Sequence, residues 1–169
     1  MARGGRMTTL SKVYAKPGHL IRRCQQIAVA LFIEETAGRG FDITPVQYAA
    51  LVAIEAHPGI EATTLSALIA FDRSTLADVI ERLVGKRLVD RAADPQDRRV
   101  KRLSVTRAGE RLLAAIEPAV ERAQARILAP LPPAQRKRFL ALLEQLVDIN
   151  NQHSRAPRRD ARDAARAGD

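Results

Sequence analysis

The residues best suited to chemistry are charged and lie close together in one short run. Arg98 and Arg99 stand side by side, with Asp94 and Asp97 just before them and Lys101 just after. Guanidinium groups stay charged at neutral pH and donate several hydrogen bonds in a fixed fork that matches phosphate oxygens. We expect the two aspartates to pair with the two arginines and orient them. The run therefore indicates contact with a polyanion.

The net charge supports this interpretation because of where it is concentrated. The 169 residues carry a formal charge of +9. Between Arg82 and Arg107, nine basic residues accompany three acidic ones, which places +6 of the +9 in this segment. A local excess of this kind attracts nucleic acid over several ångströms.

Composition limits the class of protein. A hydrophobic content of 46% argues against disorder, and an aromatic content of 4% without Trp favours a helical core of Leu, Ile, Val and Ala. The single cysteine, Cys24, excludes an internal disulfide and fits a reducing cytosol. The apolar runs are too short to span a membrane, so we expect a cytoplasmic protein.

Apolar spacing and capping residues predict a mainly helical chain. Two short helices separated by a few residues, the second capped by Asp72, fit a helix-turn-helix. Thr106 is expected to cap a long helix that Pro118 kinks. The expected helices are His19–Glu35, Thr44–Ala56, Thr64–Ala70, Arg73–Lys86, Arg107–Leu128 and Ala134–Asn150.

One segment breaks the helical pattern. Leu88–Arg91 and Val100–Val105 are extended candidates on either side of a turn-rich stretch, Ala93–Arg98. The fold class is therefore mainly α with a small β-hairpin (α+β). The hairpin turn is rich in arginine, which suggests an extended loop that reaches toward a partner.

The flanking helices carry apolar stripes that the central unit cannot cover. Packing against a second copy of the chain buries them most economically. The expected organisation is a flexible basic arm (1–16), a dimerisation helix (17–43), a DNA-binding unit (44–105), dimerisation helices (106–152) and a disordered tail (153–169).

The helix after Asp72 is the candidate DNA-reading element. If its stripe of Leu76, Val79, Ile80 and Leu83 faces the core, its opposite face is free to enter a major groove. An arginine on the hairpin turn can enter a minor groove. The predicted DNA-binding residues are Arg73, Ser74, Thr75, Asp78, Arg82, Arg98, Arg99 and Lys101.

Thr44–Gly109 resembles the winged helix-turn-helix of the multiple antibiotic resistance regulator (MarR) family, and the likeness extends less sharply over about His19–Asn151. The resemblance is carried by the helix start Thr44–Tyr48 and by Asp72–Leu76, Arg82-Leu83 and Leu88–Arg91. It is most specific in the wing run Asp94–Arg99 and the exit Leu103–Gly109.

The resemblance implies a homodimer that binds a palindromic operator. It also implies that this dimer is a repressor, which leaves the operator when a small aromatic or phenolic ligand binds. By position it places Arg73, Ser74 and Thr75 at the major groove and Arg98 or Arg99 at the minor groove. Two positions depart from the family pattern, because Ala70 and Arg87 stand where glycine is usual. Both departures point to modified turns.

Family effector pockets lie between the dimerisation helices and the DNA-binding unit. An arginine there would suit a carboxylate, and the expected effectors are aromatic acids or their coenzyme A thioesters. The candidates for ligand contact are His19, Arg22, Arg23, Gln26, Tyr48 and His57.

Three alternatives remain. Cys24 would be the redox residue if the protein sensed organic peroxides, although its place on an apolar stripe suggests a buried, inert thiol. A nonspecific architectural DNA-binding protein is the second alternative. The third, an enzyme, has little support, because His19, His57 and His153 are scattered and no metal or cofactor motif is present.

Overall fold

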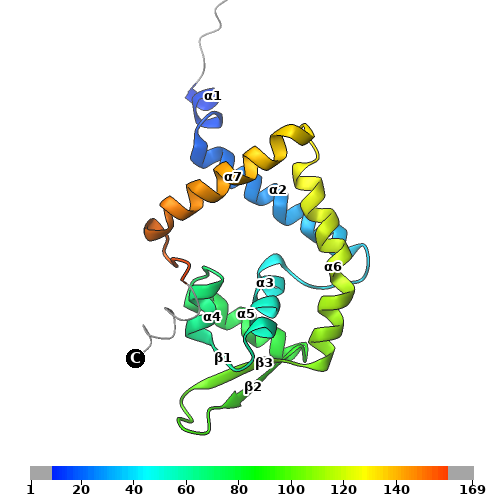
Figure 1. The fold of residues 1–169 in the computed structure, drawn as a ribbon, viewed down its shortest axis with the longest axis vertical. Helices are drawn as coiled ribbons and strands as arrows, with labels where there is room; N and C mark the ends of the chain where they lie inside the picture. Colours follow the sequence, from blue (N-terminus) through cyan, green and yellow to red (C-terminus); the bar gives the residue numbers. More distant parts are fainter. Residues whose placement is uncertain (1–8, 160–169) are drawn as a thin grey trace, which may run out of the picture.

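The computed structural model describes residues 9–159 and consists of a helical frame and a smaller lobe (Figure 1). The frame contains α1 (Thr9–Tyr14), α2 (Pro17–Ala37), α6 (Arg107–Leu128), α7 (Pro133–Ile149) and the 3-10 turn η1 (Asn151–His153). The lobe contains α3 (Pro45–Ala56), β1 (Ile60–Glu61), α4 (Ala62–Leu68), α5 (Arg73–Gly85), β2 (Val89–Ala93) and β3 (Lys101–Val105). The expected α+β class is confirmed. None of the described helices is long and apolar enough to cross a membrane.

Local capping explains where two of the helices begin. The hydroxyl of Thr44 accepts from the amide of Gln47, and the Gln47 side chain accepts from the amide of Thr44, which completes a capping box at α3. Thr106 caps α6 by accepting from the amide of Gly109. Asp72 occupies the position before α5, but its side chain makes no capping hydrogen bond there, so that part of the prediction is wrong.

The sheet has three strands rather than the two of a simple hairpin. The central strand β3 pairs antiparallel with β2, where Arg91 lies opposite Leu103, and with β1, where Glu61 lies opposite Arg102. Gly59 makes the approach to β1 possible with a φ of 82°, and its amide donates to the carbonyl of Leu103 at 2.8 Å. Strand β1, which has only two residues, was not predicted from the sequence.

The core lies where the lobe meets α6. Leu51 and Ile54 of α3, Leu83 of α5 and Leu103 of β3 are fully buried and pack in one cluster with Ile116 of α6. Helix α6 runs unbroken through Pro118, and its ribbon curves along its length (Figure 1). The lobe and α6 therefore share one hydrophobic core.

Charged residues join α2 to α6. Glu35 accepts from Arg122 at 3.2 Å and from Arg126 at 2.9 Å, and Arg126 also pairs with Glu34. The hydrogen bond from Arg126 leads the effects that lower the pKa of Glu35. The two glutamates therefore join α2 to α6 through ion pairs.

Both turns that depart from the family's glycine pattern keep a left-handed backbone. The φ angles are 53° at Ala70 and 58° at Arg87, the only non-glycine residues with positive φ in the described part of the chain. This region is unfavourable for residues with a Cβ atom. The turn geometry is therefore retained without the residue that favours it.

The two ends differ from their predictions. The basic arm expected to be flexible contains α1 between Thr9 and Tyr14, and residues 1–8 lie outside the described part. At the other end, the tail expected to be disordered is placed as far as Arg159, whose amide donates to the carbonyl of Ala67 in α4. Residues 160–169 lie outside the described part.

Candidate nucleic-acid interface

Helix α5 presents one apolar face and one polar face, as its spacing predicted. Leu76, Val79, Ile80 and Leu83 are all buried. The opposite face exposes five of the predicted DNA-binding residues, and within the described part of the chain the side chains of Arg73 and Arg82 form no ion pair. The five are Arg73, Ser74, Thr75, Asp78 and Arg82.

A tight turn positions α5 against α4. The Ser66 hydroxyl donates to the carbonyl of Phe71 at 2.5 Å, and the Phe71 amide donates to the carbonyl of Ser66 at 3.0 Å. Because Ser66 is buried, its hydroxyl cannot bond to water, and the carbonyl of Phe71 takes the place of the water. This reciprocal pair fixes the angle at which α5 leaves the turn.

The wing is the loop Asp94–Val100 between β2 and β3. It is closed by backbone bonds from Asp94 to Val100 and from Val100 to Asp97, each 3.0 Å long. Arg98 and Arg99 are exposed, and within the described residues neither guanidinium makes an ion pair. Both remain available to an external anion.

The aspartates of the wing do not pair with these two arginine side chains, which corrects the sequence-based expectation. Asp94 accepts instead from Nε of Arg102 at 2.6 Å and from the amides of Gln96 and Asp97. Asp97 accepts from the backbone amide of Arg99 at 2.9 Å. The carboxylates therefore shape the loop backbone and leave the arginine side chains unpaired.

Arg102 ties the wing to the rest of the sheet. Besides Asp94, its guanidinium contacts Glu61 of β1 at 3.1 Å and donates to the carbonyl of Gly59 at 3.3 Å. The hydrogen bond from Arg102, together with those from two backbone amides, holds the pKa of Asp94 below its ordinary value. This role of Arg102 was not predicted from the sequence, because its partners lie on two segments that are far apart in the chain, Gly59–Glu61 and Asp94.

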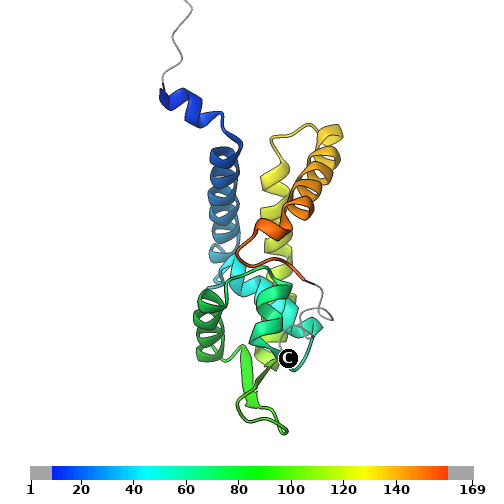
Figure 2. The same cartoon turned by 90° about the vertical axis from the view of Figure 1, so that its left-hand side faces the viewer.

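Helix α5 and the wing lie at the same end of the molecule. Figure 2 shows α4, α5 and the wing together below the frame, with α1 and the start of α7 at the opposite end. An ion pair between Arg91 of β2 and Glu81 of α5 joins the two elements directly. Lys101, the last predicted contact, is exposed, and its amine donates to the carbonyl of Arg98 at 3.2 Å.

None of the six candidate ligand residues lines either of the two cavities described below, of about 370 and 440 Å³. Four lie in the first half of α2, where Arg22 donates to Gln26 at 2.9 Å and the ring of half-buried His19 lies 5.3 Å from that of Tyr14. His57 is exposed at the end of α3. The α2 residues are His19, Arg22, Arg23 and Gln26.

Tyr48 occupies a distinct environment between α2 and α6. Its ring lies 6.0 Å from that of Phe32, and its hydroxyl donates to Glu117 at 2.6 Å. Partial burial, reinforced by the Glu117 carboxylate, raises the pKa of Tyr48 to about 12. The phenol therefore stays protonated at neutral pH and can donate a hydrogen bond.

A cavity of about 370 Å³ lies where the end of α2 meets the loop before α3. Its lining is mostly apolar, with Thr36, Asp42 and Thr44 as polar members. None of the six predicted ligand residues lines it. It nevertheless lies at the junction between frame and lobe where we expected an effector.

Cys24 is exposed on α2 rather than buried, which corrects the expectation of an inert core thiol. Its apolar neighbours Leu20, Ile21 and Ile27 are exposed as well, whereas Phe32 further along α2 is buried in the core. Among the described residues, no group of three or more His, Cys, Asp or Glu could hold a metal ion.

The family model described as "MarR family" matches residues 43–101. The chain is 30% identical over 132 residues to the HTH-type transcriptional repressor NicR of Pseudomonas putida, covering 78% of this chain and 82% of NicR.

Solved structures of transcriptional regulators are similar to this chain as well. The PcaV regulator of Streptomyces coelicolor, in complex with its natural ligand, has a TM-score of 0.72 at 34% identity, covering 80% of this chain and 94% of that one. BpsR of Bordetella bronchiseptica, whose DNA binding is regulated by 6-hydroxynicotinic acid, has a TM-score of 0.72 at 29% identity, with coverages of 80% and 95%. The repressor CouR, bound to a 23-mer DNA duplex, has a TM-score of 0.72 at 26% identity, with coverages of 84% and 97%.

Proposed function

Because the chain belongs to the MarR family of transcriptional regulators, we propose that it binds a palindromic operator as a homodimer and leaves it when a small aromatic acid binds. It is a regulator rather than an enzyme. The observation that carries the DNA-binding part is the pairing of α5 with the wing. Arg73 on the helix and Arg98 and Arg99 on the wing lie at one end of the molecule with their charges unpaired within the described chain. NicR is named a repressor, which supports the same role here.

The exposed apolar surface supports the dimer. None of the residues of α7 is buried, and its exposed side chains include Phe139, Leu142 and Leu146. Leu20 and Ile21 on α2 are also about half exposed. An apolar surface of this extent is rare on a monomer and marks an interface. A two-fold arrangement buries both faces and spaces the two α5 helices for successive major grooves, roughly 34 Å apart.

The dimer is tested by the oligomeric state of a charged variant. Leu142→Glu with Leu146→Glu should convert a dimer to a monomer in analytical ultracentrifugation. Arg111→Glu with Lys137→Glu changes exposed polar positions on α6 and α7 and should leave the dimer intact. A double-leucine variant that stays dimeric would show that α7 is not the interface.

The wing is tested by DNA binding of Arg98→Ala with Arg99→Ala. Its matched control, Lys137→Ala with Arg138→Ala, removes the same charge at the start of α7, far from the wing (Figure 1). The probe is a duplex selected by the protein from a random pool. We expect weaker binding by the wing variant alone, with a greater loss at sites flanked by A·T pairs. Equal binding by the two variants would exclude the wing contact.

Helix α5 is tested by base preference. Arg73→Ala should weaken binding to the selected duplex and relax its preference at one position, by about 1–3 kcal/mol. Wild-type protein that binds random and selected duplexes equally well would instead identify a nonspecific architectural protein.

An aromatic acid or its coenzyme A thioester fits the basic and hydrogen-bonding residues of the frame and of α3. Arg22 or Arg23 can pair with a carboxylate, and the Tyr48 hydroxyl, which donates to Glu117, can still accept a hydrogen bond from a ligand. The effector of BpsR, 6-hydroxynicotinic acid, is itself an aromatic acid. In a thermal-shift panel, one aromatic acid or thioester should stabilise the protein and lower its affinity for DNA.

The exposure of Cys24 favours one second candidate, an organic-peroxide sensor of the same fold. A peroxide in the same panel would then release DNA from the wild type but not from Cys24→Ser. Release by an aromatic acid that is unchanged in Cys24→Ser would exclude the redox mechanism.

A further inference from the structure

The chain segment after α7 returns to the DNA-binding lobe. After η1, Arg155–Arg159 runs along α4, and the amide of Arg159 donates to the carbonyl of Ala67 at 3.0 Å. The Asn151 side chain accepts from the amide of Arg158 at 2.8 Å and donates to its carbonyl at 2.9 Å. Backbone groups thus hold the segment in place and leave its side chains free.

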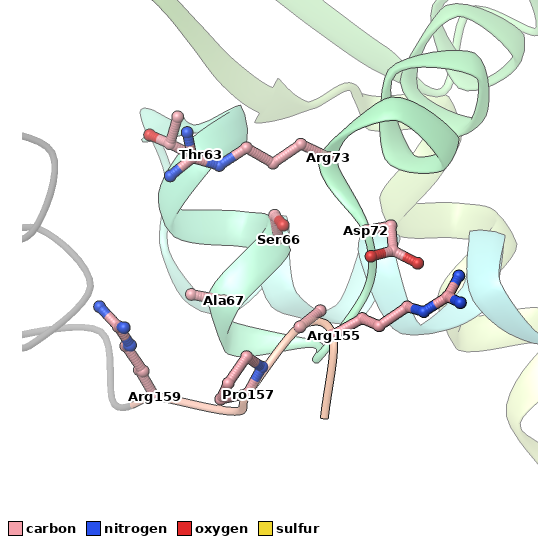
Figure 3. A pocket seen from close by; sticks show the side chains of 9 residues that line it. Thr63, Ser66, Ala67, Asp72, Arg73, Arg155, Pro157 and Arg159 are labelled. Carbon is pink, nitrogen blue, oxygen red and sulfur yellow. The ribbon is translucent and has the colours of Figure 1, made fainter. Parts of the chain in front are cut away.

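The segment and the lobe enclose a cavity of about 440 Å³. Its walls combine Arg155 and Arg159 of the segment with Thr63 of α4 and with Asp72 and Arg73 at the start of α5. Figure 3 shows Arg73 extending over α4 toward Thr63, and Arg155 extending toward Asp72. The cavity therefore joins two segments that lie far apart in the sequence.

The electrostatic character of this region is positive. Three arginines and one aspartate line the cavity, and no acidic residue occurs between Asn151 and Arg159. Arg158, which is exposed, adds a further charge beside it. Within the described part of the chain, none of these guanidinium groups is in an ion pair. Unpaired arginines with hydroxyl groups nearby form a suitable environment for phosphate oxygens.

We propose that Arg155–Arg159 is a third DNA-contacting element, which binds backbone phosphates beside the groove that α5 enters. The inference rests on the proposed operator binding, because it is the position of α5 that brings the segment to DNA. Phosphate contacts of this kind add affinity and hold the register of the protein but read no sequence. The segment is therefore expected to strengthen binding to every duplex by the same factor.

The test compares full-length proteins. Arg155→Ala, Arg158→Ala and Arg159→Ala are combined in one triple variant. Arg111→Ala, Lys137→Ala and Arg138→Ala form a control that removes the same charge from exposed positions of α6 and α7. Fluorescence anisotropy measures affinity for the selected duplex and for a random duplex of equal length, at several salt concentrations.

The triple variant should bind both duplexes more weakly by the same factor, about tenfold or more near physiological salt. The slope of log K against log salt should fall by about one for each phosphate that the variant no longer binds. Asn151→Ala, which releases the segment without changing charge, should weaken both duplexes by a smaller factor. The control should match the wild type.

Three results would overturn the proposal. In the first, the triple variant has the same DNA affinity and the same salt slope as the control. Another is tighter binding by the triple variant, which would make the segment inhibitory. In the third, inorganic phosphate stabilises the wild type but not the triple variant, and the triple variant binds DNA as tightly as the wild type. That result would identify a small-anion site. Failure of the wild type to prefer any duplex would instead reject operator binding itself.

Discussion

Arg102 of β3 donates from Nε to Asp94 at 2.6 Å across the base of the wing. The same guanidinium reaches Glu61 and the carbonyl of Gly59, so one side chain joins the wing, β1 and the turn before it. The result is a loop with a defined backbone that carries two unpaired arginines. A preorganised loop loses less conformational entropy on binding than a flexible one.

Replacing Arg102 should loosen the wing with little effect on global stability, because the ion pairs lie near the surface. We expect Arg102→Gln to speed amide hydrogen exchange several-fold within Asp94–Val100 and to weaken DNA binding. Arg91→Gln is the matched control, because it removes an ion pair from the adjacent strand without touching Asp94. Equal exchange in the wings of the two variants would contradict the role of Arg102.

The pKa of Asp94 predicts how the wing responds to acid. Hydrogen bonds from Arg102 and from two amides depress this pKa in the folded protein, so the contribution of Asp94 to stability is fully present above the ordinary carboxyl pKa. It is lost as pH falls through the lower, folded value. In an NMR titration, the amide signals of Gln96 and Asp97 should shift with a midpoint below the ordinary aspartate pKa. Arg102→Gln should raise that midpoint, and a wild-type midpoint at or above the ordinary value would be inconsistent with the pairing.

Glycine at the two left-handed turns should stabilise the protein. Relief of the strained backbone at Ala70 or Arg87 should stabilise the folded protein by about 1–2 kcal/mol. Glycine also makes the unfolded chain more flexible, which offsets about 0.5–1 kcal/mol of this stabilisation. Each of Ala70→Gly and Arg87→Gly should therefore raise the free energy of unfolding by about 0.5–1 kcal/mol. Chemical denaturation measures the change.

The control for these variants is Ala114→Gly, at an exposed position inside α6. It should lower the free energy of unfolding by about 0.5–1 kcal/mol, because a helix interior gains nothing from positive φ. Destabilisation by all three substitutions would show that the two turns carry no strain.

Gly109 allows α6 to approach Leu88, just before β2, and Val105 at the end of β3. A Cβ atom at this position would lie 2.4 Å from the carbonyl oxygen of Leu88 and 2.5 Å from Cγ1 of Val105. The backbone would have to move, so Gly109→Ala should cost about 1–3 kcal/mol of stability. Gly85→Ala is the matched control because nothing lies within 4 Å of its added Cβ, and it should be neutral or slightly stabilising. Similar thermal unfolding of the two variants would exclude a tight contact at Gly109.

Features set by neighbouring residues were predicted correctly from the sequence. The helix start at Thr44, the Thr106 cap and the buried stripe of α5 all depend on residues three or four positions apart. The run of charged residues likewise predicted the arginines of the wing. The modified turns expected at Ala70 and Arg87 are not observed, because both residues keep the left-handed backbone that glycine would adopt.

Tertiary structure alone decided which distant groups meet. The sequence offered Asp94 several arginines, and only the register of β3 selected Arg102 over Arg98 and Arg99. In the same way, β1 exists because β3 supplies its hydrogen-bonding partner, and Arg159 lies against α4 because the chain turns back after α7. Such pairings depend on long-range packing, which residue spacing does not encode. The amino-acid pattern thus determined the longer helices, the hairpin and the exposed charges, and the packed fold determined which of those charges are held in ion pairs and which stay unpaired.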